Sequence, residues 1–210
     1  MSLLVSLRLI FHPVELPPRN HLWDHGFVLP DGVTRVTKQT LLDLVGTGNK
    51  YFKLTEKHFQ CIGSERQRVK IAAQVFSKST AEALREADAE EHGKYADFLE
   101  LWNDFFDVAN ATREVHPDNP LKSGYGGPNV TAQKEILDQT FEHALKLRGI
   151  TKAGRTKKGL IPFQKGIMMV CRAIPMIWQQ LQERYPDDIA FMLTARLNQD
   201  IIENFFSCIR

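Results

Sequence analysis

Apolar residues recur at intervals of three and four over most of the chain, a pattern that predicts a mainly helical fold. The periodic segments cover residues 65–86, 92–111, 130–148, 167–185 and 187–210. The second segment carries many aromatic residues on its apolar face, and Thr131 is a candidate cap for the third. Pro175 predicts a bend or a break in the fourth. We therefore expect five helices to dominate the structure.

The first fifty residues have a different pattern. Alternating apolar positions over residues 3–11 predict a strand, and the prolines that follow prevent its continuation as a helix. Leu29-Pro30-Asp31-Gly32 is typical of a tight turn, so residues 22–37 are expected to form a short hairpin. A small helix is predicted over residues 38–45, ended by glycines. Residues 113–128 contain several prolines and glycines, which predict a loop.

Composition narrows the class of protein. Of the 210 residues, 43% are hydrophobic and 25% are charged, values typical of a globular chain rather than a disordered one. The formal net charge is only +2, so binding to a nucleic acid would need a local basic patch rather than bulk charge. Three cysteines far apart argue against a disulfide framework. No run approaches the roughly 20 apolar residues of a membrane helix, so we expect no membrane partner.

One such basic patch is the stretch 146–165, which holds seven lysines and arginines and no acidic residue. In a nucleic-acid-binding protein, a stretch of this kind contacts the DNA phosphates. A solvated loop explains the same composition equally well, and aromatic residues that would stack on bases are sparse here. Both interpretations stay open on the sequence alone.

The familiar phosphate-loop, dinucleotide-binding, metalloprotease-helix and hydrolase-elbow motifs are absent from the sequence. Two carboxylates stand out instead. Asp200 and Glu203 are three residues apart, so they share one face of the predicted helix and could hold a hard cation between them. They lie among bulky apolar residues, where an unpaired charge is costly, so a partner or a metal ion is expected. The alternative is a solvated acidic edge of the helix.

Three parts of the chain carry more specific motifs. They are Lys53-Leu54-Thr55-Glu56-Lys57-His58 with Arg68-Val69-Lys70-Ile71-Ala72-Ala73-Gln74-Val75-Phe76-Ser77, then Phe105-Phe106-Asp107-Val108-Ala109-Asn110, and finally residues 194–210 around Asn198-Gln199-Asp200-Ile201-Ile202-Glu203-Asn204. In this order they resemble segments of the P-element-type transposases, which include the THAP-domain-containing members. The first two are similar to that family's helical GTP-binding insertion domain, and the third to the segment with the last acid of its RNase H-like centre. The resemblance spans nearly the whole chain and is weakest over 113–190.

The resemblance implies a site for a guanine nucleotide. In the family the Phe-Asp-x-x-Asn stretch contacts the base, so Phe106 would stack on the ring and Asp107 would accept from the guanine N1 and N2 donors. Asn110 would add a polar contact, and Lys70 is the candidate to meet a phosphate. The alternative is an aromatic helix that packs in the core with Asp107 at its surface. We expect GTP as the ligand and no hydrolysis of it, because the phosphate loop is lacking.

The resemblance also implies metal-dependent DNA cleavage and strand transfer in an intact parent protein, with Mg²⁺ as the cofactor. Glu203 would be a metal ligand, and Asp200 would assist it as a second one. Near the N-terminus, His12 stands where the family has its second catalytic aspartate. Imidazole does not supply the negative charge that Mg²⁺ prefers. The family's first acid and a zinc-coordinating THAP module have no counterpart here, so whether the chain is an enzyme stays open.

These inferences define the fold, the parts and the partners that we expect. The fold class is mainly α, a helical GTP-binding insertion domain flanked by remnants of an RNase H-like α/β domain. Residues 1–50 would belong to the RNase H-like part, 51–190 to the insertion domain, and 191–210 to the return into the catalytic helix. The expected partners are transposon-end DNA, a guanine nucleotide and a second copy of the chain, in the nucleus. The alternative function is a catalytically dead, domesticated or decayed helical module that contacts DNA or protein without binding a nucleotide.

Overall fold

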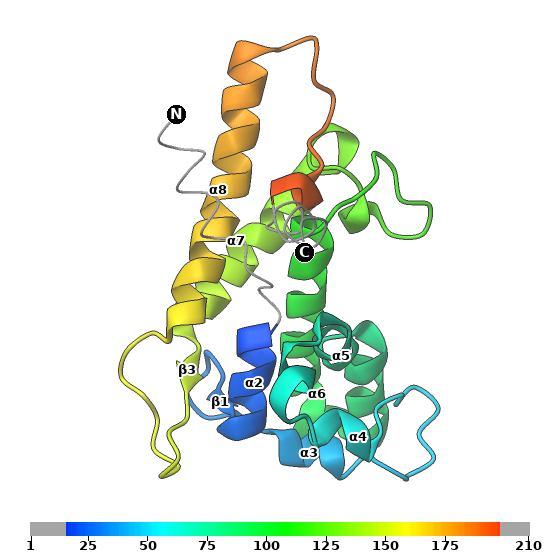
Figure 1. The fold of residues 1–210 in the computed structure, drawn as a ribbon, viewed down its shortest axis with the longest axis vertical. Coiled ribbons are helices and arrows are strands. Elements are labelled where there is room, and N and C mark those ends of the chain that lie inside the picture. Colours follow the sequence, from blue (N-terminus) through cyan, green and yellow to red (C-terminus); the bar gives the residue numbers. More distant parts are fainter. Residues whose placement is uncertain (1–15, 198–210) are drawn as a thin grey trace. The chain divides into compact units, whose positions relative to one another are not determined.

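A computed structural model describes residues 16–197 as helices with one small sheet (Figure 1). The helices are α2 (Leu16–Asp24), α3 (Lys38–Leu42), α4 (Glu56–Phe59), α5 (Val69–Val75), α6 (Lys78–Ala109), α7 (Val130–Lys146) and α8 (Pro162–Arg184). The strands are β1 (Phe27–Val28), β2 (Arg35–Val36) and β3 (Arg148–Gly149). Short 3-10 turns cover Gly63–Gln67, Pro120–Lys122, Gly127–Asn129 and Thr194–Leu197. The predicted mainly helical class is confirmed, and within the described part of the chain no helix has the length and apolar character needed to cross a bilayer.

The described residues form two compact units. The sheet unit comprises residues 16–103 and 143–165, and the loop unit comprises residues 104–142 and 166–197. Helices α6, α7 and α8 contribute residues to both units. The predicted functional residues are therefore divided between them, and each unit has its own packing.

The sheet has the order β2-β1-β3, and both pairings are antiparallel. Phe27 at its centre pairs with Val36 on one side and with Gly149 on the other. The β1–β2 connection turns at Gly32, whose φ of 75° is in the left-handed region. The Asp31 carboxylate accepts the backbone N–H groups of Val33 at 3.0 Å and Thr34 at 2.9 Å, which stabilises the turn. The predicted hairpin is confirmed at these residues.

Aromatic side chains fill the core of the sheet unit. The Phe98 ring lies 5.5 Å from that of Trp102 and 6.0 Å from that of Phe27, with edge-to-face geometry in both pairs. Phe76 stacks on Trp102 at 5.8 Å. All four side chains are essentially buried, so the aromatic face of α6 that the sequence shows is a packing face over residues 95–102.

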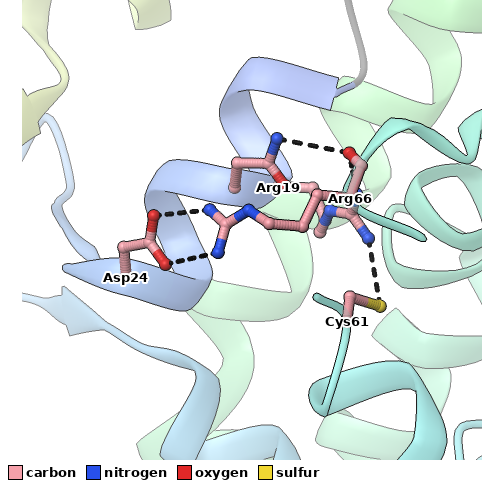
Figure 2. A network of polar contacts seen from close by, with 5 residues as sticks. Arg19, Asp24, Cys61 and Arg66 are labelled. Carbon is pink, nitrogen blue, oxygen red and sulfur yellow. Dashed lines mark hydrogen bonds and ion pairs between the residues drawn. The ribbon is translucent and has the colours of Figure 1, made fainter. Parts of the chain in front are cut away.

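Arg19 connects α2 to the segment before α5 (Figure 2). Its fully buried guanidinium donates to the carbonyl oxygen of Arg66 at 2.6 Å and contacts the sulfur of Cys61 at 3.5 Å. Arg66 in turn forms a two-pronged ion pair with Asp24, at 2.5 and 2.9 Å. A buried guanidinium is costly without acceptors, so these contacts hold the Gly63–Gln67 turn against α2.

The single helix predicted over residues 65–86 is wrong. This stretch holds a 3-10 turn, α5 and the start of α6, and the helical structure is interrupted between Val75 and Lys78. At the break the Ser77 hydroxyl donates to the carbonyl oxygen of Gln74 at 2.9 Å and accepts the Thr80 N–H at 3.3 Å. The Thr80 hydroxyl also donates to Gln74, at 3.0 Å. These side-chain bonds end one helix and cap the next.

Helix α6 then runs through the gap that was expected between the segments 65–86 and 92–111. Asp88 has non-helical angles within it (φ −162°, ψ 103°), and its carboxylate accepts the N–H of Glu91 at 2.8 Å. Asp88 therefore acts as an internal cap at a kink, and the segment that follows confirms the predicted aromatic helix.

Two other helices differ from expectation in part. The predicted third helix is confirmed as α7, but Thr131 lies inside it and is not its cap, because α7 begins at Val130 after a 3-10 turn. The prediction of a break at Pro175 is wrong, since α8 continues through this residue. Residues 187–193 are irregular and Thr194–Leu197 form a 3-10 turn, so the helix predicted from residue 187 is wrong over its described part. The strand predicted over residues 3–11 lies outside the described residues. The prolines after it predicted an extended segment rather than a helix, which is wrong from residue 16 on: α2 begins at Leu16 and holds Pro17 and Pro18 in its first turn, where proline is tolerated.

Acid is expected to destabilise the sheet unit between about pH 6.5 and 4. Burial lowers the pKa of His143 to about 4, and burial together with the positive charge of Lys157 lowers that of His21 to about 4. Both lie below the ordinary value, so the unfolded state binds more protons in this window and the free energy of unfolding falls as the pH drops. Because both rings are partly exposed, we expect a loss of roughly 2–3 kcal/mol between pH 7 and 4.5.

Urea unfolding at the two pH values measures this loss. The variant His143→Phe should lose about half as much free energy on acidification, because one of the two neutral rings is no longer available for protonation in the unfolded state. An unfolding midpoint that does not change between pH 7 and 4.5 would contradict the assignment.

Candidate nucleotide site at the end of helix α6

Asp107 lies on the last turn of α6, in the loop unit, and its side chain is only 12% exposed. One carboxylate oxygen accepts the side-chain N–H of Asn119 at 2.8 Å. The other lies 3.4 Å from the ammonium nitrogen of Lys122. A negative charge near a helix C-terminus is unfavourable, so the cation and the amide donor compensate both the helix dipole and the lost hydration.

The loop after α6 holds Asn119 in place through its backbone. The Asn119 side-chain oxygen accepts the N–H of Leu121 at 3.0 Å, while the His116 ring nitrogen Nδ1 accepts the N–H groups of Asp118 and Asn119 at 3.2 Å each. The backbone N–H of His116 donates to the side-chain hydroxyl of Ser123 at 3.0 Å. The amide of Asn119 is thus oriented, with its oxygen turned to the loop and its nitrogen to Asp107.

A second set of contacts fixes the far end of this loop. Gln133 of α7 is fully buried; its side-chain nitrogen donates to the carbonyl oxygens of Ser123 and Gly124, and its oxygen accepts the N–H of Gly126 at 3.2 Å. Next to this position, the backbone of Tyr125 forms two hydrogen bonds of 2.8 Å with the backbone of Met192. The loop predicted over residues 113–128 is confirmed as an ordered one.

The structure brings Phe106, Asp107 and Asn110 together on one turn. Phe106 is 8% exposed and its ring centre lies 5.5 Å from that of Phe105, so most of the ring faces the interior. A base would meet only the small exposed part of it. Asn110 is exposed and follows the helix, with its N–H bonded to the carbonyl oxygen of Phe106 at 2.9 Å.

The other predicted site residues are found elsewhere. Lys70 is exposed on α5 and belongs to the sheet unit. Asp200 and Glu203, the predicted metal ligands, lie outside the described residues, as does His12. Among residues 16–197 no group of three or more histidines, cysteines and acidic residues could hold a metal ion.

Sequence reasoning missed Asn119 and Lys122. They lie 12 and 15 positions after Asp107, beyond any helical repeat, in a stretch whose prolines and glycines indicated only a loop. The one available signal was Asn119 directly before Pro120, a pair typical of a turn that starts with an asparagine side chain bonded to the backbone.

The arrangement matches the hydrogen-bonding edge of guanine. Guanine presents two neighbouring donors, N1–H and the 2-amino group, beside the acceptor O6, and a carboxylate accepts from both donors at once. Asn119 and Lys122 supply donors within reach of the same carboxylate. Adenine presents the opposite pattern, an acceptor N1 beside an amino donor. The donor and acceptor set around Asp107 therefore fits guanine.

Comparisons with known proteins show which proteins this chain resembles. A family model described as the TNP-like, GTP-binding insertion domain matches residues 19–122, a range that includes Lys70, the motif at 106–110 and both loop residues. The Transposable element P transposase of Drosophila melanogaster is 32% identical over 202 residues, which are 91% of this chain and 25% of that protein. The structure titled Drosophila P element transposase strand transfer complex matches with a TM-score of 0.75 and 31% identity, over 94% of this chain and 44% of that chain.

The chain thus spans about a quarter of the length of the curated relative and less than half of the solved chain. The sequence match covers 91% of this chain and the structural match covers 94% of it. The chain belongs to the P element transposase-like proteins and carries a TNP-like, GTP-binding insertion domain over residues 19–122.

Proposed function

We propose that this chain binds a guanine nucleotide in the loop unit, with Asp107 as the residue that reads the base. The observation that carries the proposal is the nearly buried carboxylate of Asp107, held between an amide donor and an ammonium group. A carboxylate in such a place is costly unless it is compensated, and a guanine edge can compensate it with two hydrogen bonds in exchange for the one from Asn119. The name of the matching family model, a GTP-binding insertion domain, supports the same ligand.

In the proposed complex the guanine N1–H and 2-amino groups bond to the Asp107 oxygens in place of Asn119. The amide nitrogen of Asn119 then donates to O6 or to the ribose. Guanine is neutral, so Lys122 is still needed to balance the charge of the carboxylate. Phe106 contributes its exposed edge and Asn110 a polar contact beside the base. The assignment of Lys70 to a phosphate rests on the resemblance alone.

Lys122→Gln tests the proposal outside the predicted motif. Loss of the ammonium 3.4 Å from Asp107 should weaken GTP binding about three- to tenfold, because the carboxylate must then be held charged without its cation. Lys134→Gln is the matched control, since Lys134 also pairs with an aspartate, Asp138, at 2.6 Å on the protein surface. Displacement of a fluorescent guanine nucleotide measures both. Equal affinities in the two variants would count against this site.

We propose that this chain takes part in the activity of the family, metal-dependent cleavage and strand transfer of transposon-end DNA by a homo-oligomer in the nucleus. The support is the likeness to a transposase and to a strand transfer complex. Glu203 and Asp200 are the proposed Mg²⁺ ligands, and both lie outside the described residues. The division into parts at residues 50 and 190 is likewise a proposal.

A helical interaction module that does not bind nucleotides is the alternative function. The buried ring of Phe106 and the paired oxygens of Asp107 favour it to the extent that both side chains already have partners in the protein. The two functions differ in a simple way. If the chain is only an interaction module, a folded sample should bind neither GTP nor ATP, and substitutions of Asp107 should change the stability alone.

A further inference from the structure

The segment between β3 and α8, drawn in yellow in Figure 1, is an ordered hairpin within the sheet unit. Ile150 and Thr156 form an antiparallel bridge, the Lys157 N–H donates to the carbonyl oxygen of Gly149 at 2.8 Å, and the Thr151 N–H donates to Arg155 at 2.8 Å. At the tip Gly154 has a φ of 73°, which favours glycine. We call residues 148–158 the basic hairpin. The loop that the sequence left open between two interpretations thus has a fixed backbone.

The hairpin concentrates positive charge. Lys152, Arg155 and Lys158 are exposed, and none of them forms an ion pair with any residue in the described range 16–197. Arg35 of β2 adds a fourth exposed cation, with its guanidinium bonded to the carbonyl oxygen of Gly154 at 3.1 Å. No aspartate or glutamate occurs in the sequence between Glu142 and Glu183. The hairpin itself therefore has no acidic side chain to neutralise these groups.

The basic hairpin lacks the side chains with which proteins bind single-stranded nucleic acids, membranes or other proteins. It contains no aromatic residue that would stack on an unpaired base. None of the exposed large hydrophobic side chains of the described chain lies within residues 148–158, so it offers nothing to insert into a membrane or to anchor a protein interface. What it presents is a group of exposed cations on a hydrogen-bonded backbone, which suits contact with phosphates.

We propose that the basic hairpin, together with Arg35, is a surface that binds the phosphate backbone of duplex DNA without reading its sequence. The identity of the nucleic acid rests on the DNA partner of the proposed function. The surface shares no residue with the guanine site, because Arg35 and the basic hairpin belong to the sheet unit whereas Asp107, Asn119 and Lys122 belong to the loop unit. The two activities are thus expected to respond to different substitutions.

The test compares two triple variants of the full chain with the same loss of charge. One is Lys152→Gln with Arg155→Gln and Lys158→Gln, and the control is Lys94→Gln with Lys134→Gln and Arg184→Gln. Binding to a fluorescent duplex of arbitrary sequence is followed by anisotropy from about 50 to 200 mM salt. The hairpin variant should bind at least about tenfold more weakly at about 100 mM salt, and its slope of log affinity against log salt should be smaller by about two to three. The control should stay within about twofold of the unaltered chain.

Other results overturn the proposal. They are DNA affinity in the hairpin variant equal to that of the control, no DNA binding by the unaltered chain, and tighter binding to phosphatidylserine vesicles than to DNA. Thermal unfolding of both variants shows that they are folded. GTP binding, measured on the same samples, separates this proposal from the nucleotide site. If GTP binds normally and the hairpin variant binds DNA as the control does, only the hairpin proposal is contradicted. If the unaltered chain binds DNA through the hairpin but does not bind GTP, only the nucleotide site is contradicted.

Discussion

Asp107→Asn is expected to change the base preference of the protein from guanine to xanthine. The variant keeps the size of the side chain but replaces one acceptor oxygen with an amide donor, which then faces the N1–H or the 2-amino group of guanine. Loss of a charge-assisted hydrogen bond in a nearly buried site should weaken GTP binding about 100-fold. Xanthine has a carbonyl oxygen in place of the 2-amino group and accepts from the new amide, so binding of XTP should strengthen by a similar factor.

Asp118→Asn is the matched control for this experiment. Asp118 is an exposed aspartate in the same loop, and the same substitution there changes the net charge equally without touching the base. Both variants are titrated with GTP and XTP, and their thermal unfolding is compared. If Asp107→Asn binds both nucleotides as the unaltered chain does, Asp107 does not read the base. A loss of GTP binding without a gain for XTP would place Asp107 in a structural role.

Gly126→Ala is expected to cause a large loss of stability in the loop unit. Gly126 has a φ of 122°, a conformation that alanine rarely adopts, and an added Cβ would lie 2.6 Å from the ring of Trp178. The Tyr125 ring lies edge-to-face with the same tryptophan at 6.3 Å, so the indole has little freedom to move away. Backbone strain and the clash together should lower the free energy of unfolding by more than about 3 kcal/mol.

The neighbouring variant Gly127→Ala gives the cost of a positive φ in the left-handed helical region without a clash. Gly127 also has a positive φ, 56°, but an added Cβ there would only reach the carbonyl oxygen of Ala190 at 3.7 Å, an ordinary contact. We expect a loss of about 1 kcal/mol from the left-handed conformation alone. Urea unfolding of both variants gives the comparison. Equal losses in the two would mean that the packing of Trp178 against the loop is not tight.

Helices and turns were predictable where local sequence signals decide the structure. The turn at Leu29–Gly32 and the aromatic face before Trp102 are examples, because short-range chemistry decides both. The break between α5 and α6 was not predictable, since the apolar repeat continues across it and only the hydroxyls of Ser77 and Thr80 end the helix. Such side-chain bonds compete with helix formation without any change in the apolar pattern.

Pro175 shows the opposite case, in which packing overrides a local signal. Proline removes one helical hydrogen bond, but the buried residues Ile167, Val170, Cys171 and Ile174 form one continuous apolar face before it. Tertiary packing of such a face contributes more to a helix than one backbone bond. For the candidate site, Asp107 was proposed because one helical turn resembles a motif of the family. Its partners Asn119 and Lys122 were not, because only the fold of the loop brings them to the carboxylate.

Calorimetric titration of the unaltered chain with GTP and with ATP tests the central claim most directly. If Asp107 and its two loop partners read a guanine edge, GTP binds with a stoichiometry of one and ATP binds at least about 100-fold more weakly, because the adenine edge leaves the carboxylate without donors. Equal affinities for the two nucleotides, or no binding of either by a sample whose cooperative unfolding shows that it is folded, would contradict the account.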